Sequence, residues 1–265
     1  MYMLTIHGKR IALSFILGLV IGIVAGIIGV GGGEFRIPAL TYLMGSSIIV
    51  TASLNLLIGF FTVIVSFFLR LSTSLAGDNS ILYGAYLSIG SIFGAYLGAM
   101  ITGKFSDRIL RLIIVAYLLI MGLRFTFEPL IGEVRENLLF QESLIPFYLI
   151  VFGFLISMLS AMFGVAGGEM RIPILIMAFG LGIKLAGTAS LFASIVTVGI
   201  GFLKHFHMGH FEVKFTWITL SMAIGSILGA FTGTFLAIFI HEQHLKPILG
   251  VVLIIATIRF VMRQQ

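Results

Sequence analysis

Long apolar segments alternate with short polar intervals along most of the chain, and this pattern predicts helices that span a membrane. A spanning helix needs about 20 mainly apolar residues, because each residue advances an α-helix by about 1.5 Å. The alternation of apolar and polar positions over about ten residues that is typical of a membrane β-barrel does not occur. We therefore expect an all-α polytopic membrane protein, with apolar segments at Ile11–Val30, Ile48–Leu69, Ile81–Ile101, Leu110–Leu123, Leu144–Val165, Leu185–Leu203, Phe215–Ile240 and Ile248–Val261.

The composition agrees with this pattern and excludes a soluble globular protein. Of the 265 residues, 59% are hydrophobic and 10% are charged, whereas soluble domains are about 45–50% apolar and about 25% charged. The net charge of +6 is better explained by Lys and Arg at cytoplasmic loop ends than by nucleic-acid binding. The chain has no cysteine, which excludes disulfides, thiolate metal sites and cysteine nucleophiles.

The chain contains an internal repeat with an offset of 135 residues. The stretch GVGGGEFRIPAL, Gly29–Leu40, shares nine of twelve residues with GVAGGEMRIPIL, Gly164–Leu175. At the same offset, GSIFGAYLG, Gly90–Gly98, shares six of nine with GSILGAFTG, Gly225–Gly233. Glycines at every fourth position in these helices predict close helix–helix packing. We expect two homologous transmembrane halves, residues 1–127 and 144–265, joined by a polar linker at 128–143.

The repeat allows two topologies. With four long helices per half, about eight helices span the membrane and the halves are related by an axis along the membrane normal. If the short segments Phe35–Met44 and Met170–Phe179 also cross, each half has five spans and the repeat is inverted. With Arg36 and Arg171 left out, both models place nine Lys and Arg inside and five outside, so charge does not decide between them. Because about ten residues are short for a span, we favour eight long helices plus two broken or re-entrant segments, with both termini cytoplasmic.

The glycine-rich stretches predict a break in a helix in each half. Glycine tolerates conformations that other residues resist, and Pro38 and Pro173, which lack an N–H, suit the first turn of a new helix. Irregular backbone at membrane depth is tolerated only where protein or a water-filled cavity surrounds it. Each break is therefore expected to point a helix N-terminus, with its free N–H groups and partial positive charge, at a site suited to an anion.

Each break also carries a Glu and an Arg. A charge at the centre of a membrane helix costs about 2.5–3.5 kcal/mol on insertion scales, so Glu34, Arg36, Glu169 and Arg171 must be paired or lie near an interface. Pairs across the repeats and pairs within each copy are both open. The four charges form either a structural ion-pair cluster or a site where Arg binds an oxoanion bidentately and Glu offers a protonatable partner.

Taken together, the doubled Gly-rich-to-Pro motif, the Thr/Ser-containing TASL segments after it and the duplicated four-helix halves resemble the sulfite exporter TauE/SafE family of membrane permeases. The resemblance covers nearly the whole chain and implies transport of sulfur-containing oxoanions, such as sulfite or organosulfonates, without ATP. Positions 34, 36, 169 and 171 are more often uncharged in relatives, which leaves the exact substrate open. The resemblance implies binding residues at Gly31, Gly32, Gly33, Pro38, Thr51, Ser53, Gly167, Gly168, Pro173, Thr188 and Ser190.

The hydroxyl residues have a second interpretation. Hydroxyls in membrane helices commonly bond back to the preceding turn, so Thr51, Ser53, Thr188 and Ser190 are either ligands of a tetrahedral anion or local hydrogen-bonding groups. The TASL segments are 137 residues apart, which predicts a two-residue length change in the loop before them. With that shift, Asn55 has no polar counterpart.

A histidine-rich stretch, KHFHMGHFEVK, follows a predicted helix. His205, His207 and His210 with Glu212 could be proposed as a metal site, but two histidines one residue apart do not share a helix face. We favour an interfacial loop in which Lys204, Lys214 and Arg70 contact anionic lipid headgroups. The sequence predicts no metal site and no cofactor.

These observations favour a secondary transporter of a small oxoanion in the cell membrane, working by alternating access around the two breaks. Glu34 and Glu169 are candidates for coupling protons. A cation or metal-ion transporter that uses these two glutamates as ligands is the main alternative, and a channel or scaffold is another. An enzyme is not expected, since the chain has no G-x-S-x-G, H-E-x-x-H or Walker motif.

Overall fold

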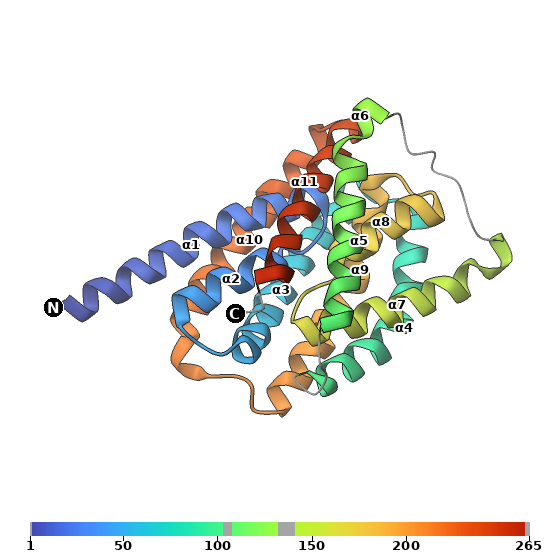
Figure 1. Ribbon diagram of the computed structural model, residues 1–265. Coiled ribbons are helices and arrows are strands. Elements are labelled where there is room, and N and C mark those ends of the chain that lie inside the picture. The colour runs from blue at the N-terminus through green and yellow to red at the C-terminus, as the bar shows by residue number, and fades with distance from the viewer. Residues whose placement is uncertain (1, 103–107, 132–140, 263–265) are drawn as a thin grey trace.

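A computed structural model describes residues 2–102, 108–131 and 141–262, and all regular structure in these ranges is helical. Figure 1 shows the arrangement. The helices of the first half are α1 (Tyr2–Ile28), α2 (Gly33–Met44), α3 (Ile48–Leu71), α4 (Asp78–Ile101) and α5 (Arg108–Thr126). Those of the second half are α7 (Ile145–Phe163), α8 (Gly168–Phe179), α9 (Ile183–His207), α10 (Thr216–Phe239) and α11 (Glu242–Met262), and the short elements are α6 (Glu128–Ile131), η1 (Glu142–Leu144) and η2 (Val213–Phe215).

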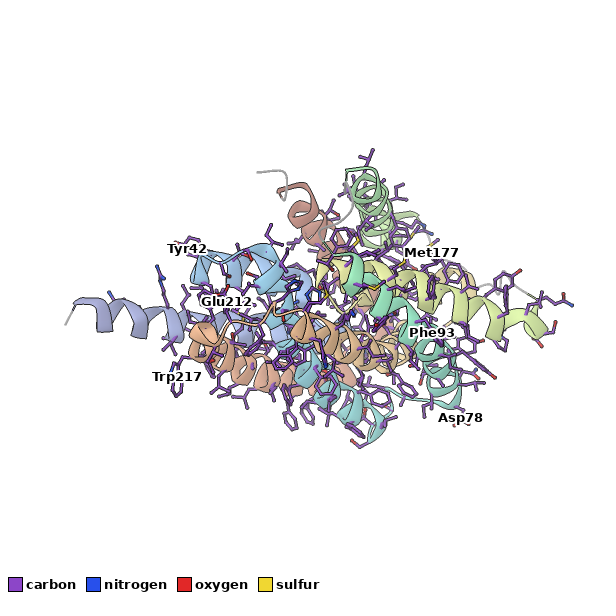
Figure 2. All side chains as sticks on the ribbon, turned by 90° about the horizontal axis from the view of Figure 1, so that it is seen from below. Tyr42, Asp78, Phe93, Met177, Glu212 and Trp217 are labelled. Atoms are coloured by element: carbon purple, nitrogen blue, oxygen red, sulfur yellow. The ribbon has the colours of Figure 1, made fainter. Side chains whose placement is uncertain are left out.

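The predicted all-α membrane fold is confirmed. Six helices in the described ranges are long and apolar enough to cross a membrane: Gly8–Ile28, Ile48–Leu71, Asp78–Ile101, Glu142–Phe163, Ile183–His207 and Thr216–Phe239. The other two predicted spans fall in α5, whose apolar part Ile114–Thr126 is shorter, and in α11. Large apolar side chains such as Phe93 and Trp217 point outward (Figure 2), as expected for a surface that faces lipid.

Helices of one half pack mainly against helices of the other half, so the two halves do not form separate bundles. The most extensive contacts join α1 to α10 and α4 to α7, and α5 packs on α11. The glycine stripes make the first two contacts possible: a Cβ on Gly22 would collide with the Ser226 carbonyl, and one on Gly94 with the Phe154 carbonyl. The predicted packing role of these glycines is therefore confirmed. Within the predicted linker 128–143, positions 132–140 lie outside the described residues.

Equivalent helices of the two halves run in opposite directions. In Figure 1, α1 enters from the left and α7 from the right, and both run toward the middle of the molecule; Figure 2 shows the same opposition. A repeat related by an axis along the membrane normal would make these helices parallel. The arrangement is therefore that of an inverted repeat, and our preference for the parallel one is wrong. Sequence could not decide because the charge distribution is the same in both models.

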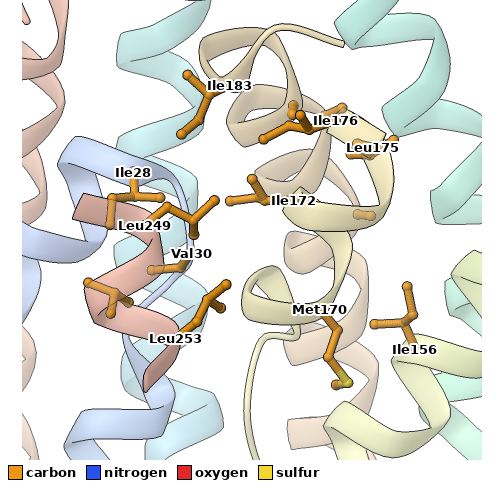
Figure 3. Packing of buried hydrophobic residues seen from close by; sticks show 14 of the residues in the cluster. Ile28, Val30, Ile156, Met170, Ile172, Leu175, Ile176, Ile183, Leu249 and Leu253 are labelled. Atoms are coloured by element: carbon orange, nitrogen blue, oxygen red, sulfur yellow. The ribbon is translucent and has the colours of Figure 1, made fainter. Parts of the chain in front are cut away.

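The middle of the molecule is closed by apolar side chains that flank the breaks. Ile28 and Val30 from the first break, Ile172 of α8, and Leu249 and Leu253 of α11 belong to one buried cluster, and Figure 3 shows them facing one another. The polar groups of the breaks therefore lie in a dry, packed environment. Any polar group there needs a protein or ligand partner.

Candidate functional site

Positive backbone φ angles at glycine produce both breaks. Between α1 and α2, Gly29, Gly31 and Gly32 have φ of 95°, 92° and 70°. Between α7 and α8, Gly164 and Gly167 have φ of 74° and 85°. L-residues with a side chain rarely adopt this conformation, so the glycine runs fix the position at which each helix ends and the next begins.

The two breaks contact each other at the centre of the molecule. A Cβ built on Gly33 would lie 3.3 Å from Val165 Cα, and one on Gly168 only 2.6 Å from Val30 Cα. Gly31 approaches Ala166 in the same way, with 2.8 Å between a built Cβ and the alanine Cβ. The site residues Gly31, Gly33 and Gly168 therefore allow the two backbones to approach closely across the repeat interface.

The prolines do not occupy the first turn of a helix, as we expected. Helices α2 and α8 begin at Gly33 and Gly168, and Pro38 and Pro173 lie inside them. The glycines with positive φ set the helix start, so each proline instead removes one backbone hydrogen bond from the interior of its helix. Gly32 and Gly167 occupy the N-cap positions and supply no side-chain cap, which leaves the amide end of each helix available to other acceptors.

The side chain of Arg36 is fully buried and folds back onto its own break. Its guanidinium donates to the Gly31 carbonyl at 2.7 Å, to Asn55 Oδ1 at 3.0 Å and to Thr62 Oγ1 at 3.4 Å. Asn55 in turn donates through Nδ2 to the Gly164 carbonyl at 2.6 Å. This arginine therefore links the first break to α3, and Asn55 continues the link to the second break.

Arg171 makes the equivalent contacts but has a richer set of hydroxyl partners. Nη1 donates to the Ala166 carbonyl at 2.7 Å and to Ser194 Oγ at 2.9 Å. Nη2 donates to Ser157 Oγ at 2.8 Å and to Thr197 Oγ1 at 2.6 Å. Arg171 is fully buried as well. The predicted arginines thus lie in polar shells enclosed by protein.

Glu34 and Glu169 lie in the first turns of α2 and α8 and are fully buried. A carboxylate in a first helical turn is stabilised by the positive end of the helix dipole. Electrostatically, Glu34 acts on Arg36 and Glu169 acts on Arg171.

The four predicted hydroxyl residues separate into two groups. Thr51 bonds to the Ser47 carbonyl at 3.1 Å, and Thr188 approaches the Lys184 carbonyl one turn earlier at 3.2 Å and the Leu75 carbonyl at 2.7 Å. For these two threonines the structure supports the local hydrogen-bonding role. Ser53 and Ser190 are fully buried, and neither hydroxyl has a protein partner in the described residues.

The predicted two-residue length change before the TASL segments is wrong. The loops from α2 to α3 and from α8 to α9 each have three residues, and α3 and α9 begin 135 residues apart, at Ile48 and Ile183. The similarity of the two TASL strings reflects composition rather than position. The structural counterpart of Asn55 is therefore Ser190, and that of Thr62 is Thr197.

The structure adds site residues that sequence reasoning missed. Apart from Asn55, which the sequence had singled out, they are the hydrogen-bonding side chains around the two arginines: Thr62, Ser91, Ser157, Ser194 and Thr197. Ser91 contributes indirectly, because it accepts a 2.6 Å hydrogen bond from Ser157. Thr62 and Thr197, at the same 135-residue offset as the arginines, are the pair that the sequence could have revealed.

Arg70 does not contact lipid headgroups as expected. It is 1% exposed and donates to the carbonyls of Gly26 and Ile27 at 3.1 and 3.0 Å, and to the Lys184 carbonyl at 3.1 Å. It therefore caps the C-terminal end of α1, whose last carbonyls lack helical partners. Lys204 lies over the Tyr96 ring, 4.6 Å from its centroid, and the side chain of Lys214 lies outside the described residues.

The histidines of the histidine-rich stretch do not converge on one point. His205 Nδ1 and His210 Nδ1 lie 3.0 Å apart, whereas His207 Nδ1 faces the Leu203 carbonyl at 2.6 Å. Among the described residues, no group of three or more His, Asp or Glu side chains is placed to hold a metal ion.

These features define a polytopic helical membrane protein built as an inverted repeat, with paired helix breaks at its centre. The chain matches the sulfite exporter TauE/SafE family model over residues 4–125 and 149–265. It belongs to this family of membrane transporters. The expected resemblance is therefore confirmed, and the two matched segments correspond closely to the two halves.

Two similar proteins are described as probable membrane transporters. The chain is 24% identical over 259 residues to the probable membrane transporter protein YunE of Bacillus subtilis, covering 91% of this chain and 93% of that protein. It is 25% identical over 259 residues to the probable membrane transporter protein MJ0441 of Methanocaldococcus jannaschii, covering 91% of each. No solved structure matches.

Proposed function

We propose that the protein is a secondary transporter of a small oxoanion, such as sulfite or an organosulfonate, and that the anion binds where the two breaks meet. The observation that carries this proposal is the environment of Arg171, which is fully buried among the hydroxyls of Ser157, Ser194 and Thr197. A guanidinium is a strong, often bidentate donor to oxoanions. Ionisable side chains buried in a membrane protein are rare and commonly mark a substrate or ion pathway.

The structure supports an occluded conformation for this transporter. Glu34, Arg36, Glu169 and Arg171 all have 0% exposure, so solvent reaches the centre from neither side. An inverted repeat makes the two sides nearly equivalent, which is the arrangement used for alternating access. Transport then requires α2 and α8 to separate in turn from the helices around them, each movement exposing one side of the site.

Glu34 and Glu169 are the proposed carriers of a coupling proton. Each lies in the same break as an arginine and acts on it electrostatically. An anion that binds the arginine competes with the carboxylate for its positive charge, and protonation of the carboxylate relieves the competition. We further propose that the protein resides in the cell membrane with both termini in the cytoplasm.

Thermal stabilisation of the purified protein by ligands tests the proposal. Sulfite, thiosulfate, sulfate and short sulfonates are compared on wild type, Arg171→Gln and the milder Thr197→Val, with Thr62→Val as the matched control in the first half. We expect at least one anion to raise the melting temperature of wild type in a dose-dependent way. The shift should be lost in Arg171→Gln and weakened in Thr197→Val more than in Thr62→Val.

The same assay includes divalent cations and Glu34→Gln. Stabilisation by a cation, lost in Glu34→Gln and absent for every anion, would overturn the anion proposal in favour of a cation transporter.

A further inference from the structure

Besides their different hydroxyl partners, the two buried arginines differ at the Nε atom. In the first half, all three nitrogens of the Arg36 guanidinium have acceptors, and Nε donates to Asn55 Oδ1 at 3.0 Å. In the second half, both terminal nitrogens of Arg171 have acceptors, but within the described residues no protein atom accepts from its Nε.

The residue that would supply the missing acceptor is Ser190. It lies 135 positions after Asn55, at the offset that also relates Arg36 to Arg171 and Thr62 to Thr197. A serine side chain is one atom shorter than an asparagine side chain along the path to its oxygen, and it does not replace the amide oxygen. Ser190 is fully buried, and its Oγ has no protein partner in the described part of the chain.

Two fully buried donors of the second half, Arg171 Nε and Ser190 Oγ, therefore have no acceptor within the described residues. A buried polar group without a partner costs about 1–3 kcal/mol, and more when it is charged. Native proteins therefore satisfy such groups with protein, water or ligand. In the first half, the protein itself satisfies the Nε of Arg36 with the oxygen of an amide. In the second half, an oxygen atom from outside the chain can take the same place.

We infer that one oxygen of the transported anion accepts hydrogen bonds from Arg171 Nε and Ser190 Oγ. In the first half, the side-chain oxygen of Asn55 occupies the equivalent position, so that no anion binds there. This inference rests on the proposed function and makes it more specific. It assigns the anion to the second half alone, so that one anion binds per chain. The side-chain oxygen of Asn55 then imitates the bound substrate oxygen.

The hydrogen bonds of Asn55 support this asymmetry between the two halves. Asn55 is fixed at both ends, because its Oδ1 accepts from Arg36 and its Nδ2 donates to the Gly164 carbonyl. Gly33 leaves room for it, since a built Cβ would lie 2.7 Å from Asn55 Nδ2. An anion could enter the first half only by displacing an amide with two hydrogen bonds. In the second half, the equivalent residue is Ser190, which has no amide to displace.

The substitution Ser190→Asn tests the inference, because it supplies the first half's amide to the second half. We expect the purified variant to melt at or above the wild-type temperature without ligand. Stabilisation by sulfite should then require at least tenfold more sulfite, because the new amide competes for Arg171 Nε. The converse variant, Asn55→Ser, should melt at a lower temperature and keep a sulfite-induced shift.

The outcomes separate the inference from the proposed function. If Ser190→Asn responds to sulfite as wild type does, the inference is wrong although the transporter proposal stands; a bound water at this position would give that result. If wild type responds to no anion in the panel, both fail. Should Ser190→Asn not fold, Ser190→Ala decides: loss of one hydrogen bond should weaken sulfite binding about fivefold to tenfold, and unchanged binding contradicts the inference.

Discussion

Arg36 and Arg171 make the same contact in the two halves: each donates a 2.7 Å hydrogen bond to the backbone carbonyl five residues earlier, at Gly31 and Ala166. Each arginine thereby satisfies a carbonyl that the helix break leaves without a helical donor. The buried charges consequently have two roles. Both hold the irregular backbone in place, and Arg171 is also the cationic group of the proposed anion site.

Replacing Arg36 with lysine should destabilise the protein although the charge is retained. Lysine lacks the planar guanidinium that reaches Gly31, Asn55 and Thr62 together. Loss of these contacts should cost about 2–3 kcal/mol, measured by chemical or thermal denaturation in detergent. The exposed Arg10 offers the control: Arg10→Lys should unfold as wild type does. Equal stability of both variants would show that the guanidinium shape is irrelevant.

A single methyl group in a glycine stripe should disturb the packing of the two halves. At Gly94, a Cβ would collide with the Phe154 carbonyl of α7. Gly94→Ala should therefore lower stability by about 1–3 kcal/mol, the usual cost of overpacking. Gly8→Ala is the matched control, since Gly8 lies in α1 with nothing within 4 Å of a built Cβ. Thermal denaturation compares the two, and similar melting temperatures would argue against the α4–α7 packing.

The inverted repeat predicts the membrane sides of two helix ends. Gly8 near the start of α1 and Glu142 before α7 should lie on opposite sides of the membrane, with Gly8 in the cytoplasm. The chain has no native cysteine, so Gly8→Cys and Glu142→Cys can be labelled individually with a membrane-impermeant thiol reagent in intact cells. Glu142→Cys alone should react. Labelling of both, or of neither, would instead favour a parallel repeat.

The contact between His205 and His210 should weaken in acid. Their Nδ1 atoms lie 3.0 Å apart, a hydrogen bond that requires one of the two nitrogens to be unprotonated. Burial lowers the pKa of His210 from its ordinary value of 6.5. Since the unfolded chain then binds more protons, this contribution to stability is fully present above about pH 7 and is lost as the pH falls below about 6.5.

Melting temperatures between pH 5 and pH 8 check this dependence. The acid-induced fall of wild type should be smaller in His210→Gln. It should persist in His207→Gln, because His207 faces the Leu203 carbonyl of its own helix rather than another histidine. The same fall in melting temperature in all three proteins would show that His210 does not cause it.

The sequence was sufficient for the fold class and for the positions of the breaks. Apolar length specifies membrane helices directly, and glycine runs such as Gly31–Gly33 mark where a helix must stop. The sequence did not predict which residues of the two halves occupy equivalent positions. The similarity of the TASL strings suggested the wrong alignment of the two halves, because four small residues recur by composition. The equivalence of Asn55 and Ser190 follows from the equal lengths of the loops before α3 and α9, which the structure shows.

The relative direction of equivalent helices in the two halves could not be predicted from the sequence either. Whether equivalent helices run parallel or antiparallel depends on how α2 and α8 return toward the side from which α1 and α7 enter, and short apolar segments fit both patterns. The role of Arg70 was hidden for a similar reason. An arginine in the last turn of an apolar helix is typical of the membrane interface, and only tertiary packing shows that it caps α1 instead.

Uptake of labelled sulfite into proteoliposomes that contain the purified protein tests the transporter proposal most directly. We expect saturable uptake in wild type, at least a tenfold reduction in Arg171→Gln and Ser190→Asn, and retained uptake in Gly8→Ala. Uptake no greater than in protein-free liposomes, or uptake that Arg171→Gln leaves unchanged, would contradict the assignment of the buried arginine to a transported anion.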